Sequence, residues 1–181
     1  MTLTQQLREA SAGDQAAWNA IVDRFSGLVW ATARAHRLSR GDAADVAQTT
    51  WLRLVEHLDR IRDPERLGAW LATTARHESL RIIRRSAREE PSDETDLFEA
   101  PDSVSLDRHL LDEERHGMLW RAFAKLSERC KRLLRLLMAD VEPSYEEVGA
   151  ALGMPVGSIG PTRIRCLEKL RTMTEIAEMG V

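Results

Sequence analysis

The segment 41–58, GDAADVAQTTWLRLVEHL, repeats its apolar side chains with the period of an α-helix. Strands would instead alternate apolar and polar residues, and such alternation is almost absent from the chain. The segment predicts a long amphipathic helix that begins near Gly41, and the chain as a whole is predicted to be all-α. The predicted buried stripe occupies positions i, i+4, i+7 and i+11, which are Ala47, Trp51, Leu54 and Leu58.

The same periodicity extends to both sides of this segment. Before it we expect helices over 3–11, 14–25 and 28–38, the second of them capped by Asp14. After it, Asp63-Pro64 predicts a loop, because a residue that precedes proline avoids helical geometry. A further helix should run from Leu67 to about Arg88. Its inward residues are predicted to be Leu67, Leu71, Ala75 and Ile82.

An acidic stretch separates this first group of helices from the second. Residues 89–114 contain eleven acidic side chains and one basic one, Arg108, and prolines stand at 91 and 101. This composition is typical of a linker. We therefore expect a first domain at 1–88, an acidic linker at 89–109 and a second domain at 110–177.

The second domain ends in a predicted helix-turn-helix. After helices over 110–126 and 127–140, Ser144 and Glu147 have the spacing of a capping box, and Gly153 is a natural left-handed C-terminal residue. A second short helix should begin near Gly157-Ser158, with Pro161 in its first turn. Two short helices joined by a glycine-containing turn are typical of a DNA-binding helix-turn-helix. An ordinary helical hairpin with a solvated basic face is the alternative.

Length and charge exclude several classes of protein. The 181 residues carry a formal net charge of −3, so any nucleic-acid contact must be local. No apolar run reaches the roughly 18 residues that a membrane-spanning helix needs, and the N-terminus does not resemble a signal peptide. We expect a cytoplasmic protein with no membrane insertion.

The reactive side chains do not form an enzyme signature. The five histidines are scattered, and no phosphate-binding loop or nucleophile motif is present. Cys130 and Cys166 lie outside any Cys-x-x-Cys pair, so we expect two buried free thiols rather than a zinc site or a disulfide. The sequence predicts no catalytic residue, no metal site and no cofactor.

A basic stripe follows the predicted loop at Asp63-Pro64. Its members repeat at intervals of four and three residues and share one helical face. Rings for stacking on unpaired bases, followed by guanidinium groups for phosphates, suit single-stranded nucleic acid. The alternative is a core tryptophan beside a solvated cationic face. The stripe comprises Trp70, Thr74, His77, Arg81, Arg84 and Arg88.

Taken together, these features resemble bacterial sigma factors of the sigma-70 family, in particular the small extracytoplasmic-function (ECF) group, which has only the second and fourth sigma domains. The resemblance covers nearly the whole chain. Segment 42–51, DAADVAQTTW, resembles the polymerase-binding helix, and 67–77, LGAWLATTARH, continued through Arg84-Arg85, resembles the segment that melts and recognises the minus-10 element. Segment 13–18, GDQAAW, resembles the opening of the first conserved region, and 145–171 resembles the minus-35 helix-turn-helix.

The resemblance implies a dissociable specificity subunit that binds the beta and beta-prime subunits of core RNA polymerase and promoter DNA, with an anti-sigma factor as a further candidate partner. The implied polymerase-binding residues are Asp45, Gln48, Thr49, Leu52, Arg53 and Glu56. The implied minus-10 residues are Asp59, Arg62, Arg66, Trp70, His77, Arg81, Arg84, Arg85 and Arg88. The implied minus-35 residues are Ser158, Pro161, Thr162, Arg163, Arg165 and Lys169.

The chain departs from the family pattern at a few positions. Trp51 stands where phenylalanine is usual, and His77 where asparagine is usual. In the recognition helix, 160–163 (GPTR) replaces a basic, serine-containing run and places Arg163 at an inward position that is usually apolar. Arg165 matches a DNA-facing position and is the first candidate for base readout.

Two other functions compete with this interpretation. A free-standing helix-turn-helix repressor or activator would need neither the 42–51 helix face nor the stripe at Trp70, and it should bind duplex DNA by itself. An anti-sigma-like scaffold would leave both basic regions without a purpose.

Overall fold

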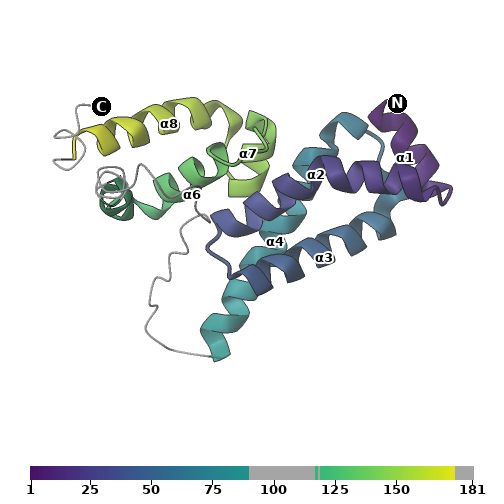
Figure 1. Ribbon diagram of the computed structural model, residues 1–181, viewed down its shortest axis with the longest axis horizontal. Coiled ribbons are helices and arrows are strands. Elements are labelled where there is room, and N and C mark those ends of the chain that lie inside the picture. The colour runs from purple at the N-terminus through teal and green to yellow at the C-terminus, as the bar shows by residue number, and fades with distance from the viewer. Residues whose placement is uncertain (90–116, 118, 174–181) are drawn as a thin grey trace, which may run out of the picture.

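The computed structural model describes residues 1–89, 117 and 119–173, and these residues form helices and loops without a strand (Figure 1). The acidic linker therefore lies almost entirely outside the described residues. Short 3-10 helices at Leu58–Arg60 (η1) and Pro64–Arg66 (η2) connect α3 to α4. The α-helices are α1 (Leu3–Ser11), α2 (Gln15–Ala35), α3 (Arg40–His57), α4 (Leu67–Glu89), α6 (Glu128–Leu137), α7 (Tyr145–Leu152) and α8 (Val156–Arg171), with 119–124 also helical.

Side-chain caps define where the first three helices begin. The side chains of Thr2, Asp14 and Ser39 accept hydrogen bonds from backbone N–H groups three residues further on. The expectation of two helices over 14–38 is wrong, because α2 is continuous. Gly27 lies in its interior, and a Cβ at this position would collide with the side chain of Val141. Gly27 therefore allows Val141 to approach closely and does not end the helix.

The buried stripe of α3 is shifted by about one residue towards the N-terminus, compared with the predicted stripe. Val46, Thr50 and Leu54 are fully buried, and the Thr50 hydroxyl donates to the Val46 carbonyl at 2.7 Å. The predicted Trp51 is only partly buried, and its ring meets that of Trp18 edge to face at 6.2 Å. The bulky indole therefore fills the rim between α2 and α3, while smaller residues occupy the centre.

The local signals around the helix-turn-helix are confirmed. Ser144 and Glu147 form a capping box, and Gly153 ends α7 with a φ of 65°, which a glycine adopts without strain. Helix α8 begins at Val156, next to the expected Gly157-Ser158, but the expectation that Pro161 lies in its first turn is wrong. Pro161 lies in its second turn, where it lacks the N–H that would bond to the Gly157 carbonyl.

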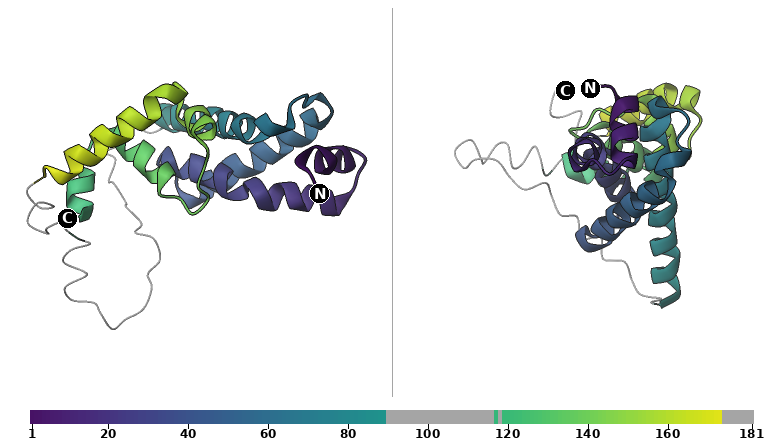
Figure 2. Two further views of the ribbon diagram at one scale, coloured as in Figure 1. Left: turned by 90° about the horizontal axis from the view of Figure 1, so that it is seen from above. Right: turned by 90° about the vertical axis from the view of Figure 1, so that its right-hand side faces the viewer.

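The two predicted domains share one hydrophobic core. Helix α7 packs along α4, and α6 packs on α2, as the two further views also show (Figure 2). Gly68 approaches α7 so closely that a Cβ there would collide with the Glu147 side chain. Residues from both halves line this core, among them Leu54, Leu67 and Leu71 from the first and Leu133, Leu136, Val148, Ala151 and Ile159 from the second.

Two polar contacts also cross this boundary. Arg37 lies 3.6 Å from the carboxylate of Glu128, and the His36 Nε2 atom lies 3.0 Å from the Ala151 carbonyl oxygen, to which its N–H donates. Burial lowers the pKa of His36, and the cationic side chains of Arg132 and Arg76 lower it further, while the bond to the carbonyl acts in the opposite sense. His36 is thus held neutral at the junction of the two halves.

The pH dependence of stability follows from this lowered pKa. Because the unfolded chain binds a proton at His36 more readily, its contribution to stability is present above about pH 6.5 and is lost as the pH falls towards the folded-state pKa. We expect the melting temperature to fall on acidification from pH 7.5 to 5.5, and to fall less in His36→Gln, which has no titratable group. Parallel pH profiles for the two proteins, recorded by circular dichroism, would contradict this.

A smaller satellite core lies between α6, α8 and residues 119–126. Its buried members are Phe123, Leu126, Leu134 and Cys166. The expectation of two free thiols is wrong, because Cys130 and Cys166 form a disulfide with Cα atoms 5.5 Å apart. Sequence spacing did not reveal this pairing, since it depends on how α8 crosses α6.

Candidate nucleic-acid and protein interfaces

The outer face of α3 combines exposed polar and apolar side chains. Asp45, Gln48, Leu52, Arg53 and Glu56 are exposed, and Thr49 is partly buried, so the six predicted polymerase-binding positions do share one surface. Leu52 is 58% exposed, and Val55, which the sequence analysis did not single out, is 54% exposed. Val55 follows Leu52 by three residues, which places the two apolar side chains next to each other on this face. An exposed apolar pair ringed by polar groups is typical of a separable protein interface.

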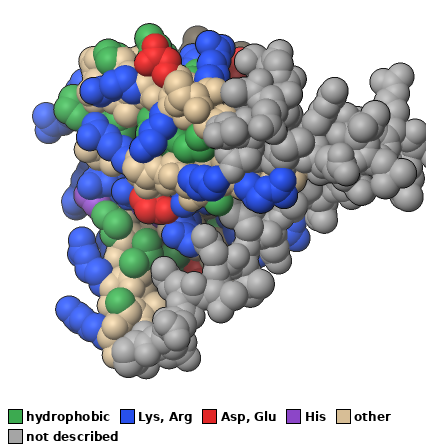
Figure 3. Space-filling model, turned by 90° about the vertical axis from the view of Figure 1, so that its left-hand side faces the viewer, with side chains coloured by type: hydrophobic (Ala, Val, Ile, Leu, Met, Phe, Trp, Pro, Cys, Tyr) green, Lys and Arg blue, Asp and Glu red, His purple; other side chains and the backbone are tan. Residues whose placement is uncertain are grey.

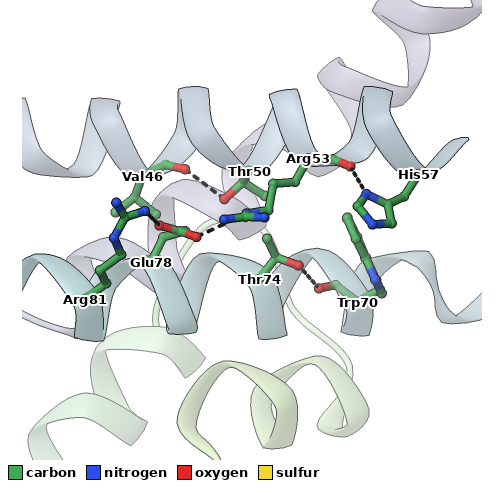
Figure 4. Close-up of polar contacts among 8 residues, drawn as sticks. All are labelled: Val46, Thr50, Arg53, His57, Trp70, Thr74, Glu78 and Arg81. Atoms are coloured by element: carbon green, nitrogen blue, oxygen red, sulfur yellow. Dashed lines mark hydrogen bonds and ion pairs between the residues drawn. The ribbon is translucent and has the colours of Figure 1, made fainter.

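The start of the basic stripe faces α3 rather than open solvent. Trp70 is partly buried, and its ring centroid lies 6.0 Å from that of His57 (Figure 4). His57 is held in turn, because its Nδ1–H donates to the Arg53 carbonyl at 2.9 Å. The Thr74 hydroxyl donates to the Trp70 carbonyl at 2.9 Å within α4. Trp70 therefore has a fixed ring with only part of its surface available for stacking.

Glu78 connects the two predicted surfaces. Its carboxylate accepts a hydrogen bond from Arg53 of α3 at 3.2 Å and another from Arg81 of α4, also at 3.2 Å (Figure 4). The Glu78 side chain is only 12% exposed, whereas that of Arg81 is 71% exposed. The sequence analysis missed this residue, although it stands three positions before Arg81 on the same helix. Glu78 holds the Arg81 guanidinium through its Nη1 atom and joins α3 to α4.

A groove of about 850 Å³ runs between α3 and α4. The groove has an uneven charge, because arginines dominate the α4 wall, whereas Asp45 is the acidic residue on the α3 wall. His77, which precedes these arginines on α4, is also exposed. Residues of both predicted surfaces line the groove: Asp45, Gln48, Thr49 and Leu52 from α3, and Arg81, Arg84, Arg85 and Arg88 from α4.

The predicted residues of the connection between α3 and α4 are all exposed. Asp59 lies in η1, Arg62 follows it, and Arg66 ends η2. The Arg66 Nε atom lies 4.0 Å from the Asp63 carboxylate, a loose pair between two exposed groups. Such a pair contributes little to stability, so the Arg66 guanidinium can exchange this partner for another anion.

The buried stripe of α8 settles which side chains reach the surface. Ile159, Thr162 and Cys166 are buried at i, i+3 and i+7. The expected inward placement of Arg163 is therefore wrong, because Thr162 takes the inward position and Arg163 is exposed. Thr162 is 5% exposed, and its hydroxyl accepts a hydrogen bond from Arg165 Nη2 at 3.3 Å. Thr162 thus orients an exposed arginine from beneath.

The remaining predicted residues of α8 lie at or near its surface. Pro161 and Lys169 are exposed, and the partly buried Ser158 donates its hydroxyl to the Pro155 carbonyl at 2.7 Å. Ile164 is 57% exposed between Arg163 and Arg165, and the sequence analysis did not select it. An exposed apolar side chain here could meet a thymine methyl group. Figure 3 shows Lys and Arg side chains gathered on the described part of the face where α6 and α8 lie in Figure 1.

Neither a metal site nor a membrane-spanning helix is found in the described residues. The described part of the chain holds no group of three or more His, Cys, Asp or Glu side chains placed to bind a metal ion. Within the described ranges, no helix has the length and apolar character that crossing a bilayer requires.

Comparisons with known proteins identify related chains. A family model, Sigma-70 region 2, matches residues 21–89, the part that contains α3 and α4. The ECF RNA polymerase sigma-E factor of Escherichia coli K12 is 27% identical over 179 residues, covering 93% of both chains. The protein of the same name from Haemophilus influenzae is 23% identical over 181 residues, covering 93% of this chain and 94% of the relative.

The fold has a counterpart among solved structures. The structure of CnrH in complex with the cytosolic domain of CnrY matches with a TM-score of 0.57 and 24% identity, covering 91% of this chain and 92% of that chain. This likeness concerns the fold, whereas the sequence matches extend over both the α3–α4 region and the helix-turn-helix. Residues 21–89 thus match Sigma-70 region 2, and nearly the whole chain is similar to ECF RNA polymerase sigma-E factors.

Proposed function

We propose that this chain is a sigma factor of the sigma-70 family, extracytoplasmic-function group, which binds core RNA polymerase through the outer face of α3, reads minus-35 duplex with α8 and holds the melted minus-10 strand along α4. The observation that carries this is Glu78, which ties Arg53 of the α3 face to Arg81 of the basic stripe through bonds of 3.2 Å. The groove between α3 and α4 has the proposed polymerase-binding residues on one wall and the proposed strand-binding residues on the other. Polymerase binding would then fix the arginines that receive the strand.

Each part of the α4 region has a role suited to its chemistry. The exposed Asp59, Arg62 and Arg66 of the connection would receive a base flipped from the duplex, which costs a few kcal/mol of unstacking. The exposed edge of Trp70 and the ring of His77 would stack on the bases that follow. Arg81, Arg84, Arg85 and Arg88 would then neutralise the backbone phosphates.

The protein would act through binding alone, in the cytoplasm, where it performs no covalent chemistry. We place its two functional units at 1–88 and 110–177, with 89–109 between them. An anti-sigma factor is a candidate partner, since CnrH was solved in complex with the cytosolic domain of CnrY. Such a partner would compete for the exposed Leu52 and Val55 on α3.

Run-off transcription with purified core polymerase on genomic fragments tests the proposal. We expect discrete transcripts only when the protein is present, and about tenfold weaker binding of core polymerase by the double variant Asp45→Arg and Gln48→Ala, which alters the exposed α3 face without touching its buried stripe. Asp23→Arg on α2 is the matched control, because it reverses an exposed charge far from that face. Unchanged pull-down of core polymerase by the double variant would contradict the assignment. Tight binding of duplex DNA without polymerase would favour a repressor.

Base readout and phosphate contact can be separated on α8. Arg165, which Thr162 orients, should discriminate one base pair by about 1–3 kcal/mol, so Arg165→Ala should relax specificity there. Lys169 lies about one turn further on, and Lys169→Ala should weaken all sites equally and reduce the salt dependence. A panel of promoter mutants measures both effects. Altered base preference in Arg163→Ala with unchanged preference in Arg165→Ala would reassign the reading role to the other exposed arginine.

A further inference from the structure

The Cys130–Cys166 disulfide connects the two helices on either side of α7. Cys130 lies in the first turn of α6, and Cys166 lies in the second half of α8. The two residues are separated by 36 positions, so the loop that the bond closes contains all of α7 and the turn at Gly153. The bond therefore fixes the position of the recognition helix relative to α6.

Apart from the disulfide, the second half of α8 is held by a small core, against which its partly buried Leu167 and Leu170 also pack. Near the start of α8, Ile159 is buried in the large core that both halves of the chain share. Cys166 instead belongs to the satellite core, which has only Phe123, Leu126 and Leu134 as its other buried members in the described residues. Since so small a core buries little apolar surface, the covalent bond contributes a large share of the stability of this half of the helix.

The two cysteine residues differ in exposure. Cys166 is 1% exposed, whereas Cys130 is partly buried and lies near the surface. The Cys130 N–H donates to the N-cap Ser127 hydroxyl at 3.4 Å, which places this cysteine at the N-terminus of α6, where the helix dipole favours a thiolate. A cysteine near the surface at a helix N-terminus, beside a buried second cysteine, is an arrangement typical of redox-sensing pairs.

We propose that Cys130 and Cys166 form a reversible, hydroperoxide-responsive thiol pair that sets how firmly α8 is held for minus-35 binding, an inference that rests on the proposed role of α8. Transcription takes place where thiols are kept reduced, and disulfides in that environment are mostly transient and redox-sensing. The bonded state is then the signalling state, and the dithiol is the resting state.

The oxidation requires one equivalent of a hydroperoxide, written here for hydrogen peroxide. The Cys130 thiolate attacks one peroxide oxygen, the O–O bond breaks, and Cys130 becomes a sulfenic acid with release of hydroxide, which takes up a proton as water. The Cys166 thiol then attacks the Cys130 sulfur, and its proton leaves with the sulfenic oxygen as a second water. Two electrons pass from the thiol pair to the peroxide in total. Exchange with a dithiol reductant restores both thiols.

Opening the bond should loosen α8 without unfolding the chain, because Ile159 and the shared core still hold its first turn. We expect amide hydrogens in 163–171 to exchange roughly tenfold faster in the reduced protein, with little change in α2 and α3. We also expect the oxidised protein to bind minus-35 duplex more tightly, because its α8 is already fixed in the reading position.

The experiment uses the full-length protein, treated with hydrogen peroxide or with dithiothreitol and then desalted before any assay. Thiol alkylation followed by mass spectrometry counts the free cysteines, hydrogen exchange reports on α8, and run-off transcription with untreated core polymerase reports on function. The double variant Cys130→Ala and Cys166→Ala, which cannot form the bond, should resemble the reduced protein under both treatments. The single variant Cys130→Ser should leave Cys166 unbonded and remove the peroxide response.

Three outcomes decide the proposal. Peroxide-dependent loss of both thiols with slower exchange in α8, reversed by dithiothreitol, supports it. Thiols that stay free after peroxide, or a bond that forms without changing exchange in 163–171, overturns it. In the third outcome, amide hydrogen exchange in 163–171 changes reversibly while neither the oxidised nor the reduced protein supports transcription. That result supports the thiol pair and overturns the assignment of the chain's function instead.

Discussion

Replacing Arg81 and Arg84 together with alanine is expected to lower open-complex formation on duplex promoters by about 100-fold. Both guanidinium groups line the groove between α3 and α4, and each hydrogen bond to a charged group contributes about 1.5–3 kcal/mol. The same variant should lose much less activity on a template that is already melted across the minus-10 element, since no unstacking has to be offset there. Run-off transcription from the two templates, each with the wild-type protein as reference, measures the difference.

The control for this variant removes the same charge elsewhere. Arg8→Ala and Arg24→Ala alter exposed positions on α1 and α2, outside the groove. This control loses the same two positive charges, but at positions outside the groove. It should therefore retain open-complex formation. Equal losses on duplex and pre-melted templates by the Arg81 and Arg84 variant would indicate a folding defect and would contradict a role in strand holding.

Leu71→Ala is expected to lower the free energy of unfolding by about 2–5 kcal/mol, because Leu71 is fully buried in the shared core and its truncation leaves a cavity. The loss should reach the second half of the chain, so that amides of α7 lose protection from hydrogen exchange together with those of α4. Urea denaturation followed by hydrogen exchange measures both effects. Ile83→Ala on the same helix is the matched control, since Ile83 is 39% exposed and should change stability little.

Unchanged protection of α7 in Leu71→Ala would mean that the two halves unfold independently. A single transition in which both halves lose structure would instead show that the core shared by Leu71, Val148 and Ile159 acts as one cooperative unit.

The elements that sequence reasoning located correctly depend on residues close together in the chain. The bounds of α1, the Asp14 cap, the capping box of Ser144 with Glu147 and the left-handed Gly153 involve interactions over three to five residues, which a sequence pattern records directly. The exposed α3 face was also predictable, because a helical period fixes which side chains lie opposite the buried stripe.

The features that were missed depend on contacts between distant segments. The break expected between residues 25 and 28 does not occur, and Gly27 is explained by its close approach to Val141, which no local pattern relates to it. The disulfide, the burial of Thr162 beneath Arg165 and the shared core all require the position of α8 relative to α6 and α4. Glu78 was overlooked because its role depends on Arg53, 25 residues earlier on a neighbouring helix.

The packing of α7 along α4 has a consequence for the energetics of promoter engagement. Elements named minus-35 and minus-10 are about 25 base pairs apart, or roughly 85 Å at 3.4 Å per base pair, so a chain whose helix-turn-helix lies against α4 cannot span them. Separating the halves exposes Val148 and Ile159 and breaks the contact from His36 to Ala151. The observed affinity for a promoter is then the intrinsic affinity reduced by the fraction of molecules that are open. Any partner that stabilises the separated halves raises promoter affinity without touching DNA.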